Sequence, residues 1–200
     1  MSKVITISRE FGSGGREIGF RLAQKLGIPF YDKELIALAA EDSNISEDLF
    51  RANDEVISQV KRNTQNYTTL DPFSSTYEIP VSDQLFMIQS KIIRQLANQG
   101  PCVIIGRCSD VIVEDAFQVF ICCSLKKRVE RLLSLEEDPT VDTKKMEHRI
   151  RSIDGKRRDY YQYYSGNEWG KPKNYDLCLN SGKLGIERCV DIIADMQNLF

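Results

Sequence analysis

Apolar positions along the chain fall into two alternating patterns. Five short apolar runs lack the in-and-out alternation of a half-exposed strand, which is typical of strands covered on both faces. Between these runs, apolar residues recur at helical spacing, as at Ile18, Leu22 and Leu26, and Gly27 then provides a helix stop. Strands that alternate with helices predict an α/β fold in which βαβ units build a parallel sheet. The predicted strands are residues 4–8, 28–31, 102–106, 117–122 and 175–180.

Three further apolar stripes predict helices in the later part of the chain. The first of them stops at Gly100 and Pro101, a pair that ends helices because proline lacks an N–H donor. The stripes continue the α/β pattern to residue 199. They consist of Leu85, Ile88, Ile92, Ile93 and Leu96, of Val129, Leu132 and Leu133, and of Ile186, Val190, Ile193 and Leu199.

Two segments interrupt this alternation. The first, residues 41–81, is polar and includes residues 63–66 (Asn-Thr-Gln-Asn) and 71–75 (Asp-Pro-Phe-Ser-Ser). We expect one or two helices and a loose connection there. The simplest interpretation of this segment is a surface excursion without chemistry.

The second interruption, residues 136–173, is rich in basic residues. A run of charge is usually a solvated helix face. Its place between the fourth and fifth predicted strands is also where a lid over a phosphate site would lie, and we favour that interpretation. Asp154 and Asp159 are the expected ion partners of Arg151, Lys156, Arg157 and Arg158. The basic residues of the segment are Lys144, Lys145, Arg149, Arg151, Lys156, Arg157 and Arg158.

A glycine-rich turn follows the first predicted strand and leads directly into a helix. Residues 10–17 read Glu-Phe-Gly-Ser-Gly-Gly-Arg-Glu, and such a turn directs backbone N–H groups and the positive end of a helix at a phosphate. Against the P-loop pattern G-x-x-x-x-G-K-[ST], Glu10 replaces the first glycine, Arg16 the lysine and Glu17 the Ser/Thr. The turn alone fits equally well a tight βα connection, or a dinucleotide fingerprint whose acidic partner is Asp32.

Composition narrows the class of protein. The 200 residues are 42% hydrophobic and 28% charged, which is ordinary for one globular domain. A net charge of −2 gives no reason to expect binding to nucleic acid or to a membrane surface. The sequence has neither a membrane-spanning run nor a signal-peptide pattern, so we expect a cytoplasmic protein.

The cysteines are expected to be reduced thiols rather than disulfides or zinc ligands. The chain has no C-x-x-C pair, and its single histidine, His148, lies in the charged segment. Most of the cysteines lie in apolar runs, where cysteine behaves as a small hydrophobic residue. The six are Cys102, Cys108, Cys122, Cys123, Cys178 and Cys189.

Several specific motifs are spread along almost the whole chain. They are residues 5–19 (Ile-Thr-Ile-Ser-Arg-Glu-Phe-Gly-Ser-Gly-Gly-Arg-Glu-Ile-Gly), 29–35 (Pro-Phe-Tyr-Asp-Lys-Glu-Leu), 100–108 (Gly-Pro-Cys-Val-Ile-Ile-Gly-Arg-Cys), 160–161 (Tyr-Tyr) with 169–170 (Trp-Gly), 175–181 (Tyr-Asp-Leu-Cys-Leu-Asn-Ser) and 184–187 (Leu-Gly-Ile-Glu). Together these motifs resemble the cytidylate kinase-like family, a branch of the P-loop nucleoside monophosphate kinases.

This resemblance implies the architecture in more detail. We expect a three-layer P-loop NTPase fold with a five-stranded parallel sheet, a helical monophosphate-binding insertion and a basic lid, all in one domain of residues 1–200. The implied parts are a core of residues 1–40, 100–135 and 174–200, a monophosphate-binding region of residues 41–99, and a lid of residues 136–173.

The resemblance also implies a site for ATP, Mg²⁺ and an acceptor nucleotide. Arg107 would clamp the acceptor phosphate, a task that suits the forked guanidinium, although a structural ion pair is the alternative. The loop after the last strand would contact the adenine ring. The implied catalytic residues are Arg16, Arg107, Arg151, Arg157 and Arg158; those for ATP are Gly12, Ser13, Gly14, Gly15, Arg16, Glu17, Asn180 and Ser181; those for the acceptor are Asp32, Arg107 and Cys108; and those for magnesium are Glu17 and Ser13.

Three positions complicate this assignment. Cys108 stands where cytidylate kinases have an aspartate, and a thiol cannot replace a carboxylate that fixes a base or sugar. Glu10 brings negative charge to the phosphates unless it pairs with Arg9 or Arg16. Asp32 is a candidate for positioning substrate or magnesium, and an N-cap of the next helix is an equally good interpretation.

The predicted function is therefore ATP-dependent phosphoryl transfer to a nucleoside monophosphate, with CMP or dCMP as the first choice, giving the diphosphate and ADP. The expected partners are small-molecule nucleotides, without nucleic acid or membrane, and the sequence predicts no particular oligomeric state. The alternatives are a nucleotide-binding regulatory protein with little transferase activity and a kinase of another small phosphorylated metabolite.

Overall fold

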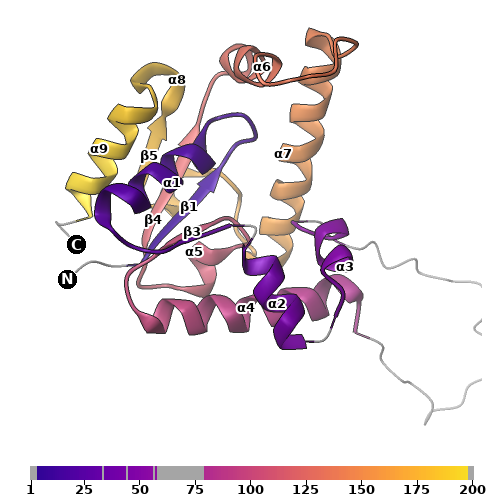
Figure 1. The fold of residues 1–200 in the computed structure, drawn as a ribbon, viewed down its shortest axis with the longest axis vertical. Coiled ribbons are helices and arrows are strands. Elements are labelled where there is room, and N and C mark those ends of the chain that lie inside the picture. Colours follow the sequence, from indigo (N-terminus) through magenta and orange to yellow (C-terminus); the bar gives the residue numbers. More distant parts are fainter. Residues whose placement is uncertain (1–3, 33, 44, 56, 58–78, 198–200) are drawn as a thin grey trace, which may run out of the picture.

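Five parallel strands form the central sheet, in the order β2-β3-β1-β4-β5. The structure is a computed structural model that describes residues 4–197 except residues 33, 44, 56 and 58–78. Helices cover both faces of the sheet (Figure 1), so the predicted three-layer α/β fold is confirmed. The strands are β1 (Ile5–Arg9), β2 (Phe30–Tyr31), β3 (Val103–Ile105), β4 (Phe117–Cys122) and β5 (Leu177–Asn180).

The observed strands β2 and β5 are shorter than predicted because turns use the flanking residues. The backbone N–H of Ile28 donates to the carbonyl of Ala23, which closes the preceding helix rather than starting a strand. At the other strand, the N–H of Tyr175 donates to the carbonyl of Pro172 in a 3₁₀ turn. Apolar character alone therefore placed these strands correctly but not their first residues.

The helices follow the predicted stripes and add several short elements. The helix that follows the glycine-rich turn ends at Gly27, which adopts a left-handed conformation (φ +67°) as a C-cap. The helical elements are α1 (Gly15–Leu26), α2 (Glu34–Ser43), α3 (Glu47–Ala52), α4 (Val81–Gln99), α5 (Ser109–Ile112), α6 (Leu125–Leu133), α7 (Thr143–Ser165), the 3₁₀ turn η1 (Pro172–Asn174), α8 (Ser181–Leu184) and α9 (Ile186–Met196).

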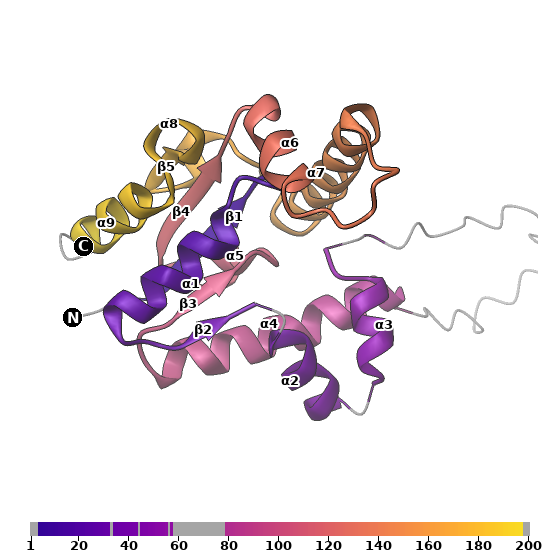
Figure 2. The same ribbon diagram turned by 45° about the horizontal axis from the view of Figure 1, so that its top comes forward.

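Two apolar clusters fill the layers on either side of the sheet. On one face α1 and α9 pack side by side over residues such as Ile7, Val119 and Ile121. On the other face α2 and α4 pack against Ile104 and around Phe50 of α3 (Figure 2). Because alternate residues of β3 enter different clusters, the sheet is buried on both faces, as the uninterrupted apolar runs predicted.

The basic segment forms a long helix that packs on α6. Asp142 caps the start of α7, where its carboxylate accepts a 2.8 Å hydrogen bond from the backbone N–H of Lys145. Met146 and Ile150 of α7 are buried against Val129 of α6. Figure 2 shows α6 and α7 standing beside the turn that links β1 to α1, with α2 and α3 across from them.

Two further expectations, on membrane-spanning helices and on the burial of the cysteines, can be checked in the residues that the structure describes. Within those residues no helix combines the length and apolar character that a bilayer crossing requires. Cys178 is exposed although it lies in a strand, whereas Cys102 and Cys189 are buried as expected. Residues 63–66 and 71–75 and Leu199 lie outside the described residues.

Candidate functional site: the glycine-rich turn and the arginines beside it

The glycine-rich turn is shaped by backbone conformations that favour glycine. Gly12 and Gly14 have φ values of +77° and +82°, and Gly14 is the N-cap of α1. A Cβ atom on Gly14 would approach the Cδ1 atom of Ile186 to 2.5 Å. The turn therefore holds the N-terminus of α1 open, where unpaired N–H groups and the helix dipole attract anions.

Three successive carbonyl groups of the turn are bonded to neighbouring elements. The Nη1 atom of Arg128 donates to the Phe11 carbonyl at 3.2 Å, and that of Arg131 donates to the Gly12 carbonyl at 2.7 Å. The buried hydroxyl of Ser181 donates to the Ser13 carbonyl. These bonds fix the turn from α6 and α8.

Acidic side chains complete this support and do not form the predicted pairs. The carboxylate of Glu10 accepts a 2.7 Å hydrogen bond from the backbone N–H of Cys123 and lies 3.7 Å from Arg128, not against Arg9 or Arg16. Burial raises its pKa. Asp154 accepts from the Phe11 N–H at 2.8 Å and pairs with Arg128. The direct partner of Asp154 thus comes from α6 rather than from segment 136–173, and Arg157 of that segment interacts with Asp154 only through its charge.

Asp32 links the turn to the end of β3. One of its oxygens, Oδ2, lies 2.6 Å from the Nε atom of Arg16, and Oδ1 lies 3.5 Å from an Nη atom of Arg107. The Arg16 side chain is 58% exposed and its guanidinium lies 5.9 Å from the ring centre of Phe30. Because both oxygens of Asp32 are engaged by arginines, the ion pairs account for this buried carboxylate better than the predicted N-cap role does.

Arg107 is held by a second carboxylate. Its Nε and Nη2 atoms each donate to Asp54 at 2.9 Å, which is a bidentate pair. Only 1% of the Arg107 side chain is exposed. The predicted alternative for Arg107, a structural ion pair, thus describes its contacts in this structure.

Glu55 gathers two further arginines. Its carboxylate lies 2.6 Å from Arg9 and 2.9 Å from Arg157, and it accepts the backbone N–H of Arg107 at 3.2 Å. Burial disfavours the charged form, but Arg9 and Arg157 outweigh burial and hold the pKa of Glu55 well below its usual range. Burial has the larger effect at Asp54, whose pKa is raised despite Arg107.

These groups surround one cavity of about 520 Å³. It extends from the N-terminus of α1, past Asp32, to Arg107 at the end of β3, with Arg9 and Arg157 beside it. Ligand sites of open α/β sheets form at this carboxyl edge of the strands. Among the residues predicted to form the site, those that line the cavity are Gly12, Gly14, Gly15, Arg16, Glu17, Asp32, Arg107 and Arg157.

The other predicted site residues lie elsewhere. Ser13 is fully buried behind the turn, and Asn180 caps α8 through the Lys183 N–H. Cys108 is buried against Tyr160 and Tyr161, and burial raises the pKa of its thiol. Arg151, Lys156, Arg158 and Asp159 are exposed on α7.

The donor set fits a polyphosphate better than it fits magnesium. The open N-terminus of α1 and Arg16 are suited to the phosphates of ATP. The predicted magnesium ligands do not meet: Ser13 is buried outside the cavity, and the carboxylate of Glu17, which lines the cavity, is paired with Arg21 at 2.5 Å. These two residues therefore do not form a magnesium site in this structure.

Besides Glu10 and four apolar side chains, four charged residues of the cavity wall were not predicted as site residues. Asp54 and Glu55 lie in the polar segment 41–81, for which a surface excursion was the simplest interpretation and a monophosphate-binding region was the one that the family resemblance implied. Their place at the cavity wall does not fit a surface excursion. Arg131 is on α6, three residues after Arg128, and Arg9 precedes the turn. The i, i+3 spacing of the two α6 arginines was the available signal, because it places them on one helix face.

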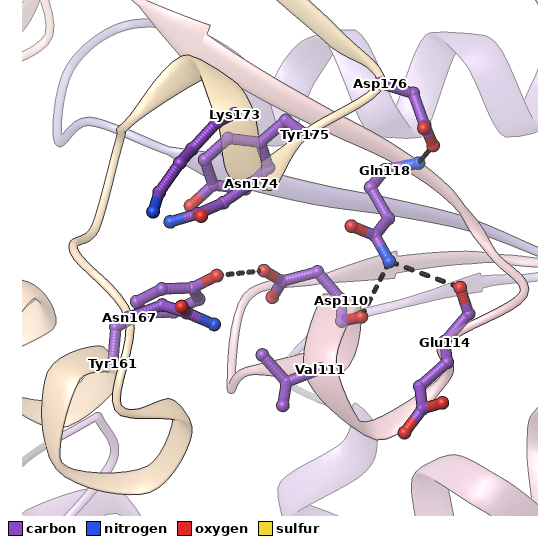
Figure 3. A pocket seen from close by; sticks show the side chains of 10 residues that line it. All are labelled: Asp110, Val111, Glu114, Gln118, Tyr161, Asn167, Lys173, Asn174, Tyr175 and Asp176. Atoms are coloured by element: carbon purple, nitrogen blue, oxygen red, sulfur yellow. Dashed lines mark hydrogen bonds between the residues drawn. The ribbon is translucent and has the colours of Figure 1, made fainter.

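A second cavity of about 360 Å³ lies under the loop that precedes β5. In Figure 3 the side chain of Asp110 points toward Tyr161, whose hydroxyl donates to it at 2.7 Å. Burial raises the pKa of Asp110 to about 6. Gln118 donates to the carbonyls of Asp110 and Glu114. This cavity contains none of the arginines of the first.

Comparison with solved structures shows the same fold in other proteins. An uncharacterized protein from Eubacterium ventriosum is 25% identical, with a TM-score of 0.73 and 98% of each chain covered. Shikimate kinase from Bacteroides thetaiotaomicron is 14% identical, with a TM-score of 0.56 and 98% of each chain covered. Shikimate kinase from Acinetobacter baumannii, in complex with shikimate, is 11% identical, with a TM-score of 0.52 over 98% of this chain and 93% of the other.

Sequence comparison identifies the family. No curated protein matches the chain significantly. The model of the cytidylate kinase-like family matches residues 4–183, which is nearly the whole chain and includes every strand of the sheet. Together with the P-loop kinase fold, this match supports a kinase of nucleotides or other small molecules. The chain belongs to the cytidylate kinase-like family.

Proposed function

We propose that the protein transfers a phosphoryl group from ATP to a nucleoside monophosphate, with CMP or dCMP as the first acceptors to test. The observation that carries this proposal is the cavity that joins the N-terminus of α1 to Arg107. Asp32 connects the two ends, since it contacts both Arg16 and Arg107. The positions assigned to the donor phosphates and to the acceptor phosphate thus line one space of about 520 Å³.

Positioning and charge are what this chemistry requires from the protein. The acceptor phosphate is already anionic, so it needs no strong general base. We assign the donor phosphates to the turn and Arg16, and the acceptor phosphate to Arg107. Arg157 reaches the cavity from α7, and a cation there would offset charge on the transferred group. ATP would bind together with its magnesium ion, which would offset charge on the phosphates.

The proposal includes the predicted lid and the predicted monophosphate-binding region. Residues 136–173 would act as the lid and residues 41–99 as the monophosphate-binding region. Arg157 is already at the cavity wall, whereas Arg151 and Arg158 are exposed and would contribute only after α7 moves. Asn180 and Ser181 would contribute to ATP binding mainly by supporting the turn, since Ser181 bonds to the Ser13 carbonyl.

One observation favours the alternative of a nucleotide-binding regulator with little transferase activity. Arg107 is bonded to Asp54, and Arg9 and Arg157 are bonded to Glu55. An acceptor phosphate would have to compete with these carboxylates. If they never leave, ATP can bind at the turn without an acceptor.

The test is ADP release from ATP and magnesium with each nucleoside monophosphate in turn. The proposal expects release that depends on the acceptor, largest with CMP or dCMP, and lost in Arg107→Ala. ATP binding without release on any monophosphate would favour the regulator. Release with another phosphorylated metabolite but with no monophosphate would favour the third function, a metabolite kinase.

A further inference from the structure

The acidic residues Asp54 and Glu55 bind the arginines of the cavity wall. Asp54 binds Arg107 at the end of β3, and Glu55 binds Arg9 and Arg157. Asp54 accepts two parallel hydrogen bonds from the guanidinium of Arg107, each 2.9 Å long. A planar anion with two oxygens binds arginine in this way, and so does a phosphate. The carboxylate of Asp54 thus has the geometry of a bound oxyanion, although the chain itself supplies it.

The backbone around this contact is strained. Within the described part of the chain, the non-glycine residues with positive φ are Glu55 (+53°), Arg107 (+56°) and Cys108 (+54°). All three lie at this one contact between the segment after α3 and the end of β3. Such conformations are costly and persist where the surrounding structure enforces them, often at ligand sites and switches.

The two carboxylates are held differently. Glu55 has the shielded position, with 12% of its side chain exposed, and it bonds to two guanidinium groups and one backbone N–H. Asp54 lies at the cavity wall with 28% of its side chain exposed, and among the arginines that the structure describes it bonds to Arg107 alone. Burial raises the pKa of Asp54, whereas the surrounding arginines lower that of Glu55. Asp54 is therefore the more weakly held of the two.

We propose that Asp54 occupies a phosphate-binding site formed by the guanidinium of Arg107 and acts there as an intramolecular competitor. An incoming phosphate displaces Asp54 while Glu55 stays in place. Glu55 keeps Arg9 and Arg157 at the cavity wall during this exchange. This phosphate-binding site binds an oxyanion such as phosphate, which can accept hydrogen bonds from both the Nε and the Nη2 atoms of Arg107. This inference deepens the proposed function, since the acceptor of that reaction carries such a group.

Competition of this kind predicts that removal of the competitor tightens binding. A ligand's apparent dissociation constant equals its intrinsic value divided by the fraction of molecules whose site is open. If Asp54 covers Arg107 in nine molecules of ten, its removal lowers the apparent dissociation constant about tenfold. A carboxylate that merely orients Arg107 has the opposite signature, because its loss weakens binding.

The experiment measures the binding of inorganic phosphate to the full chain without any turnover. The fluorescence of Trp169, the single tryptophan, reports binding because Trp169 lines the small cavity that also contains Arg107 and Glu55. The protein with Asp54→Asn is compared with the wild type and with Asp42→Asn. The last variant removes the same charge from an exposed pair with Lys91. Asp54→Ser is the second variant if Asp54→Asn does not fold.

We expect phosphate to bind about tenfold more tightly to Asp54→Asn than to the wild type, with no change in Asp42→Asn. Adding Arg107→Gln to Asp54→Asn should remove the gain. Unchanged or weaker binding in Asp54→Asn would overturn the proposal, and so would a gain that persists without Arg107. Because no turnover is measured, the two proposals can fail separately. The phosphate-binding site at Arg107 can be correct even if no acceptor supports ADP release, and the kinase activity can be correct even if Asp54 does not compete with phosphate.

Discussion

Glu55 in the cavity beside the glycine-rich turn and Asp110 in the second cavity are two buried carboxylates whose pKa values shift in opposite directions. At the P-loop cavity, Arg9 and Arg157 outweigh burial, and the pKa of Glu55 is lowered. At the cavity of Figure 3, hydroxyl and amide groups face Asp110, burial prevails, and its pKa is raised to about 6. The difference teaches that burial alone does not decide charge; the neighbouring cations do. The first cavity is built for anions, whereas the second keeps a carboxyl group that is costly to ionise.

The largest effect is expected from Arg107→Ala. The substitution leaves Asp54 and Asp32 without the buried guanidinium that both contact, so we expect a loss of roughly 3–5 kcal/mol in unfolding free energy. Acceptor-dependent turnover should fall about 10³-fold or more. Urea denaturation and ADP release measure the two effects. Arg94→Ala, on the exposed side of α4, is the matched control and should change neither.

The next largest effect concerns the pH dependence of stability through Asp110. Its pKa is about 6 in the folded protein, against an ordinary value of 3.8. The folded state thus retains a proton that the unfolded state has lost, and the unfolding free energy falls as pH rises from about 4 to 6. About two pKa units correspond to roughly 3 kcal/mol at most.

Asp110→Asn should flatten this fall, since an amide oxygen still accepts the Tyr161 hydroxyl without a charge. Urea titrations at several pH values between 4 and 7.5 measure it. A variant that is less stable than the wild type at pH 7.5 would contradict the account of the second cavity.

A smaller effect is expected from Gly106→Ala, which tests how tightly the arginine cluster is packed. Gly106 has a φ of +67°, and an added Cβ would lie 2.1 Å from Arg9 and 2.4 Å from Glu55. We expect a loss of about 2 kcal/mol from backbone strain and the displaced ion pair. Gly155→Ala on α7 is the control: nothing lies near its added Cβ, so the variant should gain up to about 1 kcal/mol. Equal effects of the two changes would argue against a packed cluster.

The smallest effect on stability is expected from Arg151→Ala and Arg158→Ala. Both side chains are exposed, and exposed pairs such as that of Arg151 with Glu147 contribute about 0–1 kcal/mol. Their effect on turnover tests the lid. A loss of turnover with unchanged stability would support closure of α7 over the site. Unchanged turnover would indicate that α7 contributes to the site through Arg157 and not through Arg151 or Arg158.

The sequence predicted the fold better than it predicted the site. Uninterrupted apolar runs and helical stripes are local signals, and they located all five strands and the helices α1, α4, α6 and α9. The glycine-rich turn and Arg107 were recognised for the same reason, since each is part of a contiguous motif.

The partners of these residues could not be predicted, because they come from distant parts of the chain. Glu55 is 46 residues from Arg9 and 102 from Arg157, so no local pattern connects them. Asp154 was identified as an ion partner, but α6 rather than its own segment supplies the arginine. Periodicity identifies which residues lie on one helix face; it does not identify which charges the packing of helices brings together.

The central claim is phosphoryl transfer at the P-loop cavity, and label transfer from ATP tests it most directly. The protein is incubated with magnesium, ATP labelled at the γ-phosphate and CMP, and the label in CDP is followed over time. The account predicts label in CDP with the wild type and its loss in Arg16→Ala and in Arg107→Ala. Label released only as inorganic phosphate, or label in CDP that both variants still produce, would contradict it.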